Sequence, residues 1–364
     1  MGLRIGIVGL PNVGKSTIFN ALTKAGAQVA NYPFCTIDPN VGVVPVPDIR
    51  LTKLAEIYKP EKVTPTIVEF VDIAGLVKGS SKGEGLGNQF LGNIKEMDAI
   101  LHVVRCFEDP NIVHVSEKID PVSDIEVINT ELCLKDLDTV ANRIRRLEKT
   151  AKGGDKAAVH AVTVCQKATK LLEAGEPIRK GAWTDEELPA LRELQLLTQK
   201  PVLYAANVKE SELPKGGALV DRVREIAAKE DSKVGVICGK VEMELAELSD
   251  EEARLYLKEI GLTEPSLHQL IRLGYELLGL ITFLTAGEKE VRAWTVRRGS
   301  KAPQAAGVIH SYFERGFIRA EIMSYSDLIK YGSQAAVKEK GLYRLEGKDY
   351  LICDGDVIYF RFNV

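Results

Sequence analysis

Nine residues near the start of the chain have the side chains and the spacing of a phosphate-binding loop. Residues 9–17 read GLPNVGKST and fit the pattern G-x-x-x-x-G-K-[S/T]. Glycines allow backbone N–H groups to converge on phosphate oxygens, and a helix that starts at the end of the loop adds the positive end of its dipole. We therefore expect Asn12, Val13, Gly14 and Thr17 to contact a bound nucleoside triphosphate.

The cation that faces the phosphates and the ligands of a metal ion are expected from this loop and from two segments further along the chain. Lys15 is expected to reach the β- and γ-phosphates as a catalytic residue, and the Ser16 hydroxyl is expected to bind Mg²⁺. An apolar run ends in the pattern D-x-x-G, which places the Asp72 carboxylate in the Mg²⁺ shell and the Gly75 amide near the γ-phosphate. Thr36 lies between the two motifs, where its hydroxyl is expected to complete the Mg²⁺ shell and sense the γ-phosphate.

These motifs need a parallel sheet to bring them together. Short apolar runs alternate with helical patterns, which is typical of parallel strands joined by crossover helices. The chain is therefore predicted to be an α/β protein with a parallel-rich sheet. The expected strands are Arg4–Val8, Thr66–Asp72, Ala99–Arg105, Pro201–Asn207 and Lys233–Cys238, and the expected first helix is Lys15–Ala25.

A helical segment interrupts this alternation between about residues 129 and 200. Apolar residues recur every three or four positions on both sides of Gly153-Gly154, which predicts a helical hairpin or short coiled coil. Residues 184–187 form a capping box that opens a further helix. Basic side chains cluster near the hairpin turn, and they fit either a solvated helix face or a docking surface for a polyanion. The first apolar stripe is Leu134, Leu137, Ala141, Ile144 and Leu147, and the basic cluster is Arg143, Arg145, Arg146, Lys149, Lys152 and Lys156.

The end of the chain has a different pattern. From about residue 281 the segments are short, rich in β-forming residues and separated by turns, with the last strands expected at 350–353 and 357–362. This predicts a small α+β domain. Residues 277–364 contain 13 basic and 10 acidic side chains, a net charge of +3, while the whole chain has a net charge of −3. The positive charge of the protein is therefore concentrated in this segment.

Composition excludes several other classes of protein. The chain has 364 residues, of which 45% are hydrophobic and 27% are charged, so it can bury a core over two or three domains. No apolar run approaches the roughly 20 residues that span a bilayer, and no signal peptide is expected, so no membrane partner is predicted. Six dispersed cysteines without C-x-x-C spacing indicate reduced thiols in a cytoplasmic protein. The overall charge gives no indication of DNA binding.

With these motifs the chain resembles the translation-factor class of P-loop GTPases, and its residues 85–91, GLGNQFL, are similar to a loop of the Obg-related group. The run Asn207-Val208-Lys209-Glu210, the helical insert and the small C-terminal domain together look like the YchF-type Obg-like ATPases. That resemblance covers essentially the whole chain. It implies a G domain made of residues 1–128 and 201–276, a helical insert at 129–200 and a TGS domain of β-grasp type at 277–364. It also implies ATP as the preferred nucleotide and the ribosome as a partner.

The base-recognition motif departs from that of GTPases. GTPases carry N-K-x-D, whose acid binds the N1–H and N2–H donors of guanine, whereas this chain has Val208 at the Lys position and Glu210 at the Asp position. Asn207 is retained. Because adenine lacks both guanine donors, the altered motif favours ATP, although a conventional GTPase remains an open alternative.

Two further predictions concern hydrolysis. Ras-like GTPases place a water-orienting Gln directly after D-x-x-G, and Leu76 stands there in this chain. Family resemblance points to His114 as the catalytic residue that compensates, and an ordinary surface histidine is the alternative. Asn12 resembles the residue with which related potassium-activated enzymes hold K⁺. We therefore predict Mg²⁺ as a cofactor and K⁺ as an activator.

Three readings of the function follow. The chain is an ATPase that works as a molecular switch, a ribosome- or RNA-binding factor whose turnover is incidental, or a conventional GTPase. Ribosomal RNA is expected to dock on the TGS domain and on the basic turn of the helical insert. Cys35 lies beside Thr36 and is either a redox-sensitive thiol or a small buried residue.

Overall fold

The computed structural model describes residues 3–26, 40–73, 86–109 and 119–363. The chain forms two compact units, which we describe separately. The first contains residues 1–44 and 69–273, and the second contains residues 45–68 and 274–364. Over the described ranges, no helix has the length and apolar character needed to cross a membrane. Five of the six cysteines lie in these ranges, and all five are free thiols.

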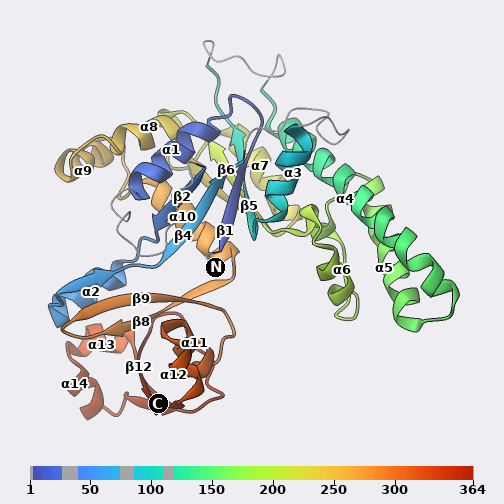
Figure 1. Ribbon diagram of the computed structural model, residues 1–364. Helices are drawn as coiled ribbons and strands as arrows, with labels where there is room; N and C mark the ends of the chain where they lie inside the picture. The colour runs from blue at the N-terminus through green and yellow to red at the C-terminus, as the bar shows by residue number, and fades with distance from the viewer. Residues whose placement is uncertain (1–2, 27–39, 74–85, 110–118, 364) are drawn as a thin grey trace. The chain divides into compact units, whose positions relative to one another are not determined.

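The first unit is built on a sheet of six strands in the order β2-β4-β1-β5-β6-β7 (Figure 1). The pairs β1–β4, β1–β5, β5–β6 and β6–β7 are all parallel, which confirms the predicted parallel-rich sheet. Every residue of β5 and β6 is buried, because central strands of such a sheet are covered on both faces. The strands are β1 (Arg4–Val8), β2 (Val41–Pro45), β4 (Ile67–Asp72), β5 (Ala99–Arg105), β6 (Val202–Asn207) and β7 (Lys233–Ile237).

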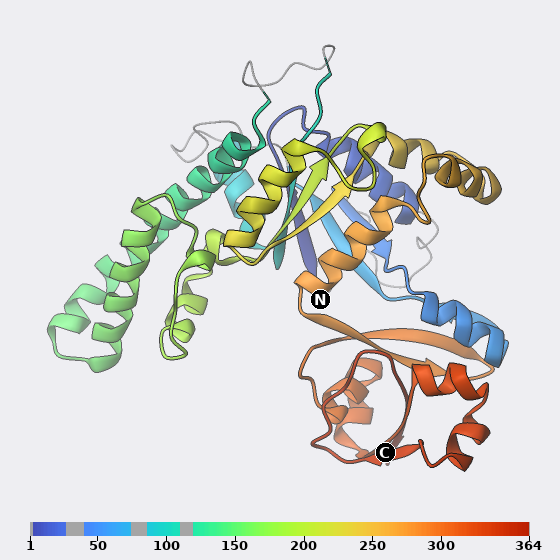
Figure 2. The same ribbon diagram turned by 180° about the vertical axis from the view of Figure 1, so that it is seen from behind.

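Helices follow most of these strands and pack against the sheet. Helix α1 (Lys15–Gly26) contacts α8 (Gly239–Leu245), and α4 (Pro121–Lys152) contacts α7 (Ala218–Lys229) (Figure 2). Helix α9 (Asp250–Glu259) opens with a capping box, in which Ser249 and Glu252 bond to each other's backbone N–H groups. The remaining helices of this unit are α3 (Leu86–Lys95), α6 (Leu188–Leu194) and α10 (Ser266–Leu277), with 3₁₀ turns η3 (Ile178–Lys180), η4 (Leu197–Gln199) and η5 (Glu210–Glu212).

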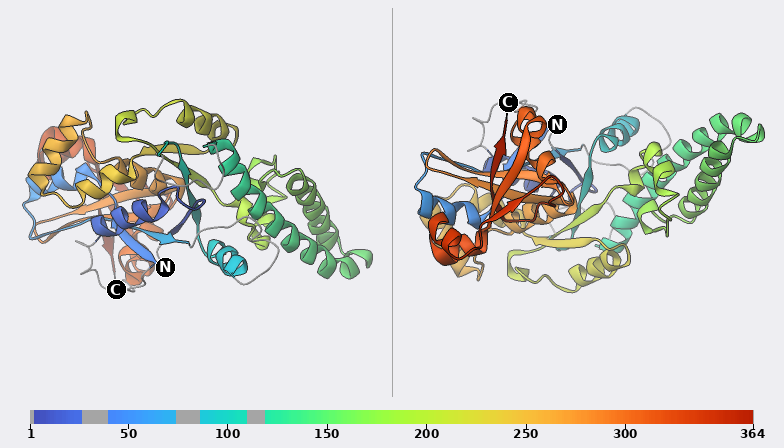
Figure 3. Two further views of the ribbon diagram at one scale, coloured as in Figure 1. Left: turned by 90° about the horizontal axis from the view of Figure 1, so that it is seen from above. Right: turned by 90° about the horizontal axis from the view of Figure 1, so that it is seen from below.

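The predicted helical hairpin is present and extends away from the sheet (Figure 3). Helix α4 ends at Lys152, Gly154 takes a positive φ of 85°, and α5 (Lys156–Glu173) begins with Asp155 as its N-cap. Two positions of the predicted stripe are wrong: Leu134 and Ala141 are both exposed, and the buried side chains are those of Cys133 and Val140. Helix α4 also runs without a break through residue 129, so no backbone boundary marks the start of the insert there.

The second unit is the predicted α+β domain. Its sheet has the order β11-β10-β12-β8-β9-β3, in which β8–β12 and β3–β9 are parallel and the other described pairs are antiparallel. The expected strand at 350–353 does not form, and Leu351 makes only an isolated bridge to Lys301. The strands are β3 (Lys62–Thr64), β8 (Leu280–Ala286), β9 (Glu290–Arg297), β10 (Phe317–Ser324), β11 (Arg344–Glu346) and β12 (Asp356–Phe362).

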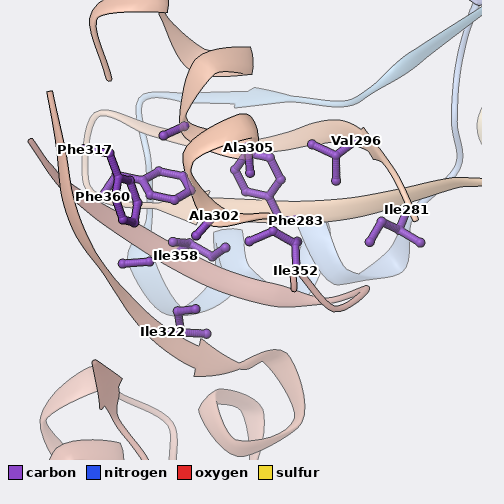
Figure 4. Packing of buried hydrophobic residues seen from close by; sticks show 12 residues of the cluster. Ile281, Phe283, Val296, Ala302, Ala305, Phe317, Ile322, Ile352, Ile358 and Phe360 are labelled. Carbon is purple, nitrogen blue, oxygen red and sulfur yellow. The ribbon is translucent and has the colours of Figure 1, made fainter. Parts of the chain in front are cut away.

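Residues 45–68 group with this second unit rather than with the nucleotide-binding sheet. Strand β3 pairs with β9, and helix α2 (Ile49–Tyr58) is held by Arg50, which donates to Asp354 over 2.7 Å. The core of the unit lies between the sheet and α11 (Ala302–Ile309), where Phe283, Ala305 and Phe360 pack together (Figure 4). The other helices are α12 (Ser311–Arg315), α13 (Tyr325–Tyr331) and α14 (Gln334–Glu339).

Candidate nucleotide site

The phosphate-binding loop and the base-recognition motif meet at one edge of the first sheet. In an open parallel sheet, ligands bind outside the carboxyl ends of the strands. The loop follows β1, Asp72 ends β4, and Asn207 ends β6. A pocket of about 780 Å³ lies at this edge, and its lining includes Asn12, Gly14, Thr17, Asn207, Val208 and Glu210. The structure therefore gathers six of the sequence-predicted residues around one cavity, and their roles remain predictions.

Asn207 joins the two motifs through its buried side chain. Its Nδ2 donates to the Val13 carbonyl oxygen over 2.9 Å, and its Oδ1 accepts from the Gly239 N–H over 3.0 Å. Gly14 has a φ of 94°, and a Cβ atom there would lie 2.1 Å from Asn207 Nδ2. Only glycine satisfies both the left-handed backbone and the close approach of the amide. The loop is therefore held from the base side of the pocket as well as by its own turn.

Lys15 and Asp72 face each other across the phosphate end of the site. Lys15 Nζ forms a salt bridge with Asp72 Oδ1, and the two side chains are 12% and 20% exposed. Lys15 is also the first residue of α1, whose Ile18 N–H bonds to the Gly14 carbonyl oxygen over 3.0 Å. The N–H groups at the start of α1, the Lys15 ammonium and the loop backbone make this place suited to an anionic group. Gly14 and Thr17 line the pocket of about 780 Å³, whereas Lys15, Ser16 and Asp72 are not among its lining residues.

The residues present fit a Mg²⁺ ion bound together with phosphate oxygens. Within the ranges that the structure describes, no group of three or more carboxylate, His or Cys side chains forms a metal cage. Mg²⁺ at a nucleotide site is typically held by one or two protein oxygens, phosphates and water. Asp72 and the exposed Ser16, the second residue of α1, supply such oxygens next to the loop.

The base end of the pocket is lined by residues from three loops and from α8. Val208 is 2% exposed, and its N–H donates to the Ile237 carbonyl oxygen over 2.8 Å, which ties the motif to β7. Glu210 is exposed, and no described residue forms a hydrogen bond or an ion pair with its carboxylate. Phe107 lies on the pocket wall, with the Arg105 guanidinium 4.6 Å from its ring centre.

Sequence reasoning missed several pocket residues. Cys238 and Gly239 come directly after β7, so the rule that ligands bind at carboxyl ends of parallel strands would have found them. Burial raises the pKa of the Cys238 thiol, so it remains a neutral wall residue. Nothing in the local sequence marks the other residues, since their placement depends on how helix α8 and the loop after β5 pack. They are Phe107, Glu108, Asp109, Lys240, Met243, Glu244 and Glu247.

Four predicted residues lie outside the described ranges. They are Thr36, which was expected at the Mg²⁺ shell, Gly75 and His114, which were expected to act in hydrolysis, and the candidate redox residue Cys35. The structure therefore describes the loop, the base motif and Asp72.

A parallel sheet with the GKST loop between β1 and α1, and an aspartate at the end of the neighbouring strand, defines a P-loop nucleoside-triphosphate-binding protein. Residues 4–143 match a family profile described as a 50S ribosome-binding GTPase, and residues 280–363 match the YchF GTPase C-terminal profile, described as a protein of unknown function. The chain belongs to the YchF family, because similar proteins named Ribosome-binding ATPase YchF match it over its full length. Those of Bacillus subtilis and Escherichia coli O157:H7 are 57% and 58% identical, with 100% of each chain covered.

A solved structure supports the same assignment. The Schizosaccharomyces pombe protein described as a YchF GTPase is 40% identical, with a TM-score of 0.89 over 99% of this chain and 98% of that one. The bacterial relatives are named ATPases and the yeast relative a GTPase. The P-loop ATPase family generally uses Mg²⁺. The relatives' names therefore disagree on whether ATP or GTP is the nucleotide. The residues at the base end of the pocket determine which of the two bases fits.

Proposed function

We propose that this protein is a Mg²⁺-dependent ATPase that prefers ATP to GTP, works as a molecular switch and associates with the ribosome in the cytoplasm. The observation that carries the proposal is the base end of the pocket. Asn207 is locked in place by Val13 and Gly239, while Val208 and Glu210 replace the Lys and Asp of a guanine site. The bacterial relatives carry names that agree with both ATP hydrolysis and ribosome binding.

The chain's own residues have distinct tasks in binding. The loop backbone and the start of α1 hold the β- and γ-phosphates, and Lys15 exchanges its salt bridge with Asp72 for contact with the phosphates. Asp72, Ser16 and Thr36 would hold Mg²⁺, which neutralises developing charge on the phosphates when bound. Val208 and Phe107 provide apolar surface for the adenine ring.

Hydrolysis additionally needs a positioned water. We assign this task to His114, with the Gly75 amide on the γ-phosphate, because Leu76 has no group that can hydrogen-bond to a water. Asn12 has a positive φ of 63° and lies on the pocket wall, which suits it to hold K⁺ beside the phosphates. A cation at that place lowers the cost of charge that develops in the transition state.

The C-terminal unit is the proposed ribosome-docking part, helped by the basic turn of the α4–α5 hairpin. Arg145, Lys149 and Lys152 follow one another on the exposed end of α4. Ribosomal RNA is the partner that such exposed positive charge fits.

Phosphate release with ATP as substrate tests the catalytic part of this proposal. We expect turnover in KCl to exceed turnover in NaCl by at least threefold, and Lys15→Ala to abolish it, since the variant loses the cation that faces the phosphates. Equal rates in the two salts would exclude K⁺ activation through Asn12. Unchanged turnover of Lys15→Ala would exclude this pocket as the active site.

A further inference from the structure

We propose that Glu244 is a specificity-determining residue that reads position 6 of the purine, and that Tyr256 positions it. This inference deepens the proposed function and rests on it. Adenine carries an amino group at position 6, which donates hydrogen bonds, and guanine carries a carbonyl oxygen there, which only accepts. A carboxylate accepts a hydrogen bond from the 6-amino group of adenine and repels the 6-carbonyl oxygen of guanine. One acidic side chain that faces position 6 therefore favours ATP.

Glu244 belongs to the wall of the pocket. Helix α8 presents one face to the cavity, formed by residues three and four positions apart, and Glu244 lies on it with Lys240 and Met243, while Glu247 lines the cavity just after the helix ends. The helix begins at Gly239, where an added Cβ atom would lie 3.4 Å from Thr17 of the phosphate loop. Glu244 is about 7.5 Å further along the helix axis, and its partner Tyr256 lines a cavity with Lys209 and Glu210 of the base motif, so it lies on the base side of the pocket.

Tyr256 holds the Glu244 carboxylate in position through a hydrogen bond. Its hydroxyl donates to Glu244 Oε2 over 2.8 Å. Tyr256 does not line the nucleotide pocket but a neighbouring cavity of about 740 Å³, which it shares with Glu210 and Glu259. Burial, followed by the hydrogen bond to Glu244, raises the pKa of the Tyr256 phenol, so it remains a donor. One carboxylate oxygen is therefore engaged, and the other is available to a ligand.

The other charged groups near this carboxylate compete weakly. Lys240 Nζ lies 3.8 Å from Glu244 Oε1, but the Lys240 side chain is 78% exposed. This solvated ion pair is weak, so a bound base can replace it. Glu210 also lines the pocket, yet no described residue orients its carboxylate, whereas Glu244 is held by Tyr256. The Gly239 N–H, a donor that could serve a carbonyl oxygen, is already engaged by Asn207. A preorganised acceptor whose nearest cation is solvated and easily displaced discriminates between the two groups.

Nucleotides that differ at single positions test the assignment by titration against the full-length protein with Mg²⁺. ATP and 2-aminoadenosine triphosphate share the 6-amino group, inosine triphosphate and GTP share the 6-carbonyl, and purine riboside triphosphate has hydrogen at position 6. We expect Glu244→Gln to lower the ratio of ATP to inosine triphosphate affinity by roughly tenfold or more, because the amide can donate to the carbonyl. Its affinity for purine riboside triphosphate should not change. Glu259→Gln, which removes the same charge outside the nucleotide pocket, is the matched control.

The role of Tyr256 is tested by a double-mutant cycle. Tyr256→Phe should lower the same affinity ratio by about threefold, and it should have no added effect in the Glu244→Gln background, since it acts through that carboxylate. Additive effects would contradict a positioning role.

If the parent prefers ATP and Glu244→Gln keeps the same ratio as the parent, this inference is wrong while the proposed function stands. If the parent binds ATP and GTP equally, both are wrong.

Discussion

A buried carboxyl group gives the fold a pH-dependent stability. Glu242 lies on the buried face of α8 at 3% exposure, and burial raises its pKa from 4.5 to about 7 although N–H groups of Ser266 and Leu267 donate to it. Its Oε1 atom has no hydrogen-bond partner among the described residues. The native protein therefore holds this proton between pH 4.5 and 7, where the unfolded chain has lost it.

The sign of the effect follows from that difference. Because the native state binds more protons in this window, stability falls as pH rises from about 4.5 to 7 and levels off above it. Glu242→Gln remains neutral, so we expect the drop in unfolding free energy between pH 4.5 and 8 to shrink by on the order of 3 kcal/mol. Urea unfolding of both proteins across this range measures it. Parallel pH profiles would show that Glu242 does not titrate in the native state.

At the phosphate end of the site the sequence predicts the loop and Asp72, while Thr36 and Gly75 lie outside the described residues and stay predictions; the base end could be predicted only in part. The GKST loop and Asp72 stand in local patterns whose spacing is dictated by phosphate and Mg²⁺. Asn207 was found through its motif. Its bonds to Val13 and Gly239, and the approach of Glu244, depend on residues that are distant in sequence and meet only through the sheet.

At the scale of elements, a buried ionic network anchors the helical insert to the nucleotide-binding sheet. Arg179 of η3 pairs with Glu230 at the end of α7 and donates to Asn129 of α4 over 3.1 Å. Tyr204 of β6 donates to the second Glu230 oxygen over 2.8 Å. Strand β6 ends at Asn207, so the network connects the base of the insert to the strand that carries the base-recognition motif.

Removing the cation from this ionic network should lower the free energy of unfolding. Arg179→Met leaves Glu230 buried without its cation, and we expect a loss of about 3 kcal/mol in unfolding free energy. Combining it with Glu230→Gln should restore part of that loss, since the uncompensated charge is gone. Urea denaturation of the two single variants and the double variant measures the coupling. A double variant that loses the sum of both single effects would argue against a direct pair.

Elements with a strong periodic pattern were predicted well, and the errors have physical causes. Strands β1 and β5 and the hairpin turn have the expected positions. Leu134 has the spacing of an apolar helical stripe, but the side chain that packs into the core of the hairpin is that of the preceding residue, Cys133. The apolar run at 350–353 forms no strand, since its pairing with the segment around Lys301 is limited to one isolated bridge at Leu351. Residues 45–68 give no local signal that their partners lie after residue 274.

At the scale of the whole molecule, the positive C-terminal unit should make ribosome binding sensitive to salt. Arg298, Lys340 and Lys348 are exposed on this unit. We expect replacement of all three by Gln to weaken co-sedimentation with ribosomes and to flatten its salt dependence, because fewer counterions are released from phosphate. Lys229→Gln with Lys258→Gln, on the first unit, is the control. Equal salt slopes for both variants would place the RNA contacts elsewhere.

The preference for ATP over GTP is tested most directly by calorimetric titration of the Mg²⁺-bound protein with non-hydrolysable analogues of ATP and GTP. Val208 and Glu210 replace the side chains that a guanine site needs, and adenine loses no hydrogen bond by the change. A mismatch of this kind is worth about 1–3 kcal/mol, so we expect the ATP analogue to bind roughly tenfold to a hundredfold more tightly than the GTP analogue. A tighter dissociation constant for the GTP analogue would contradict it.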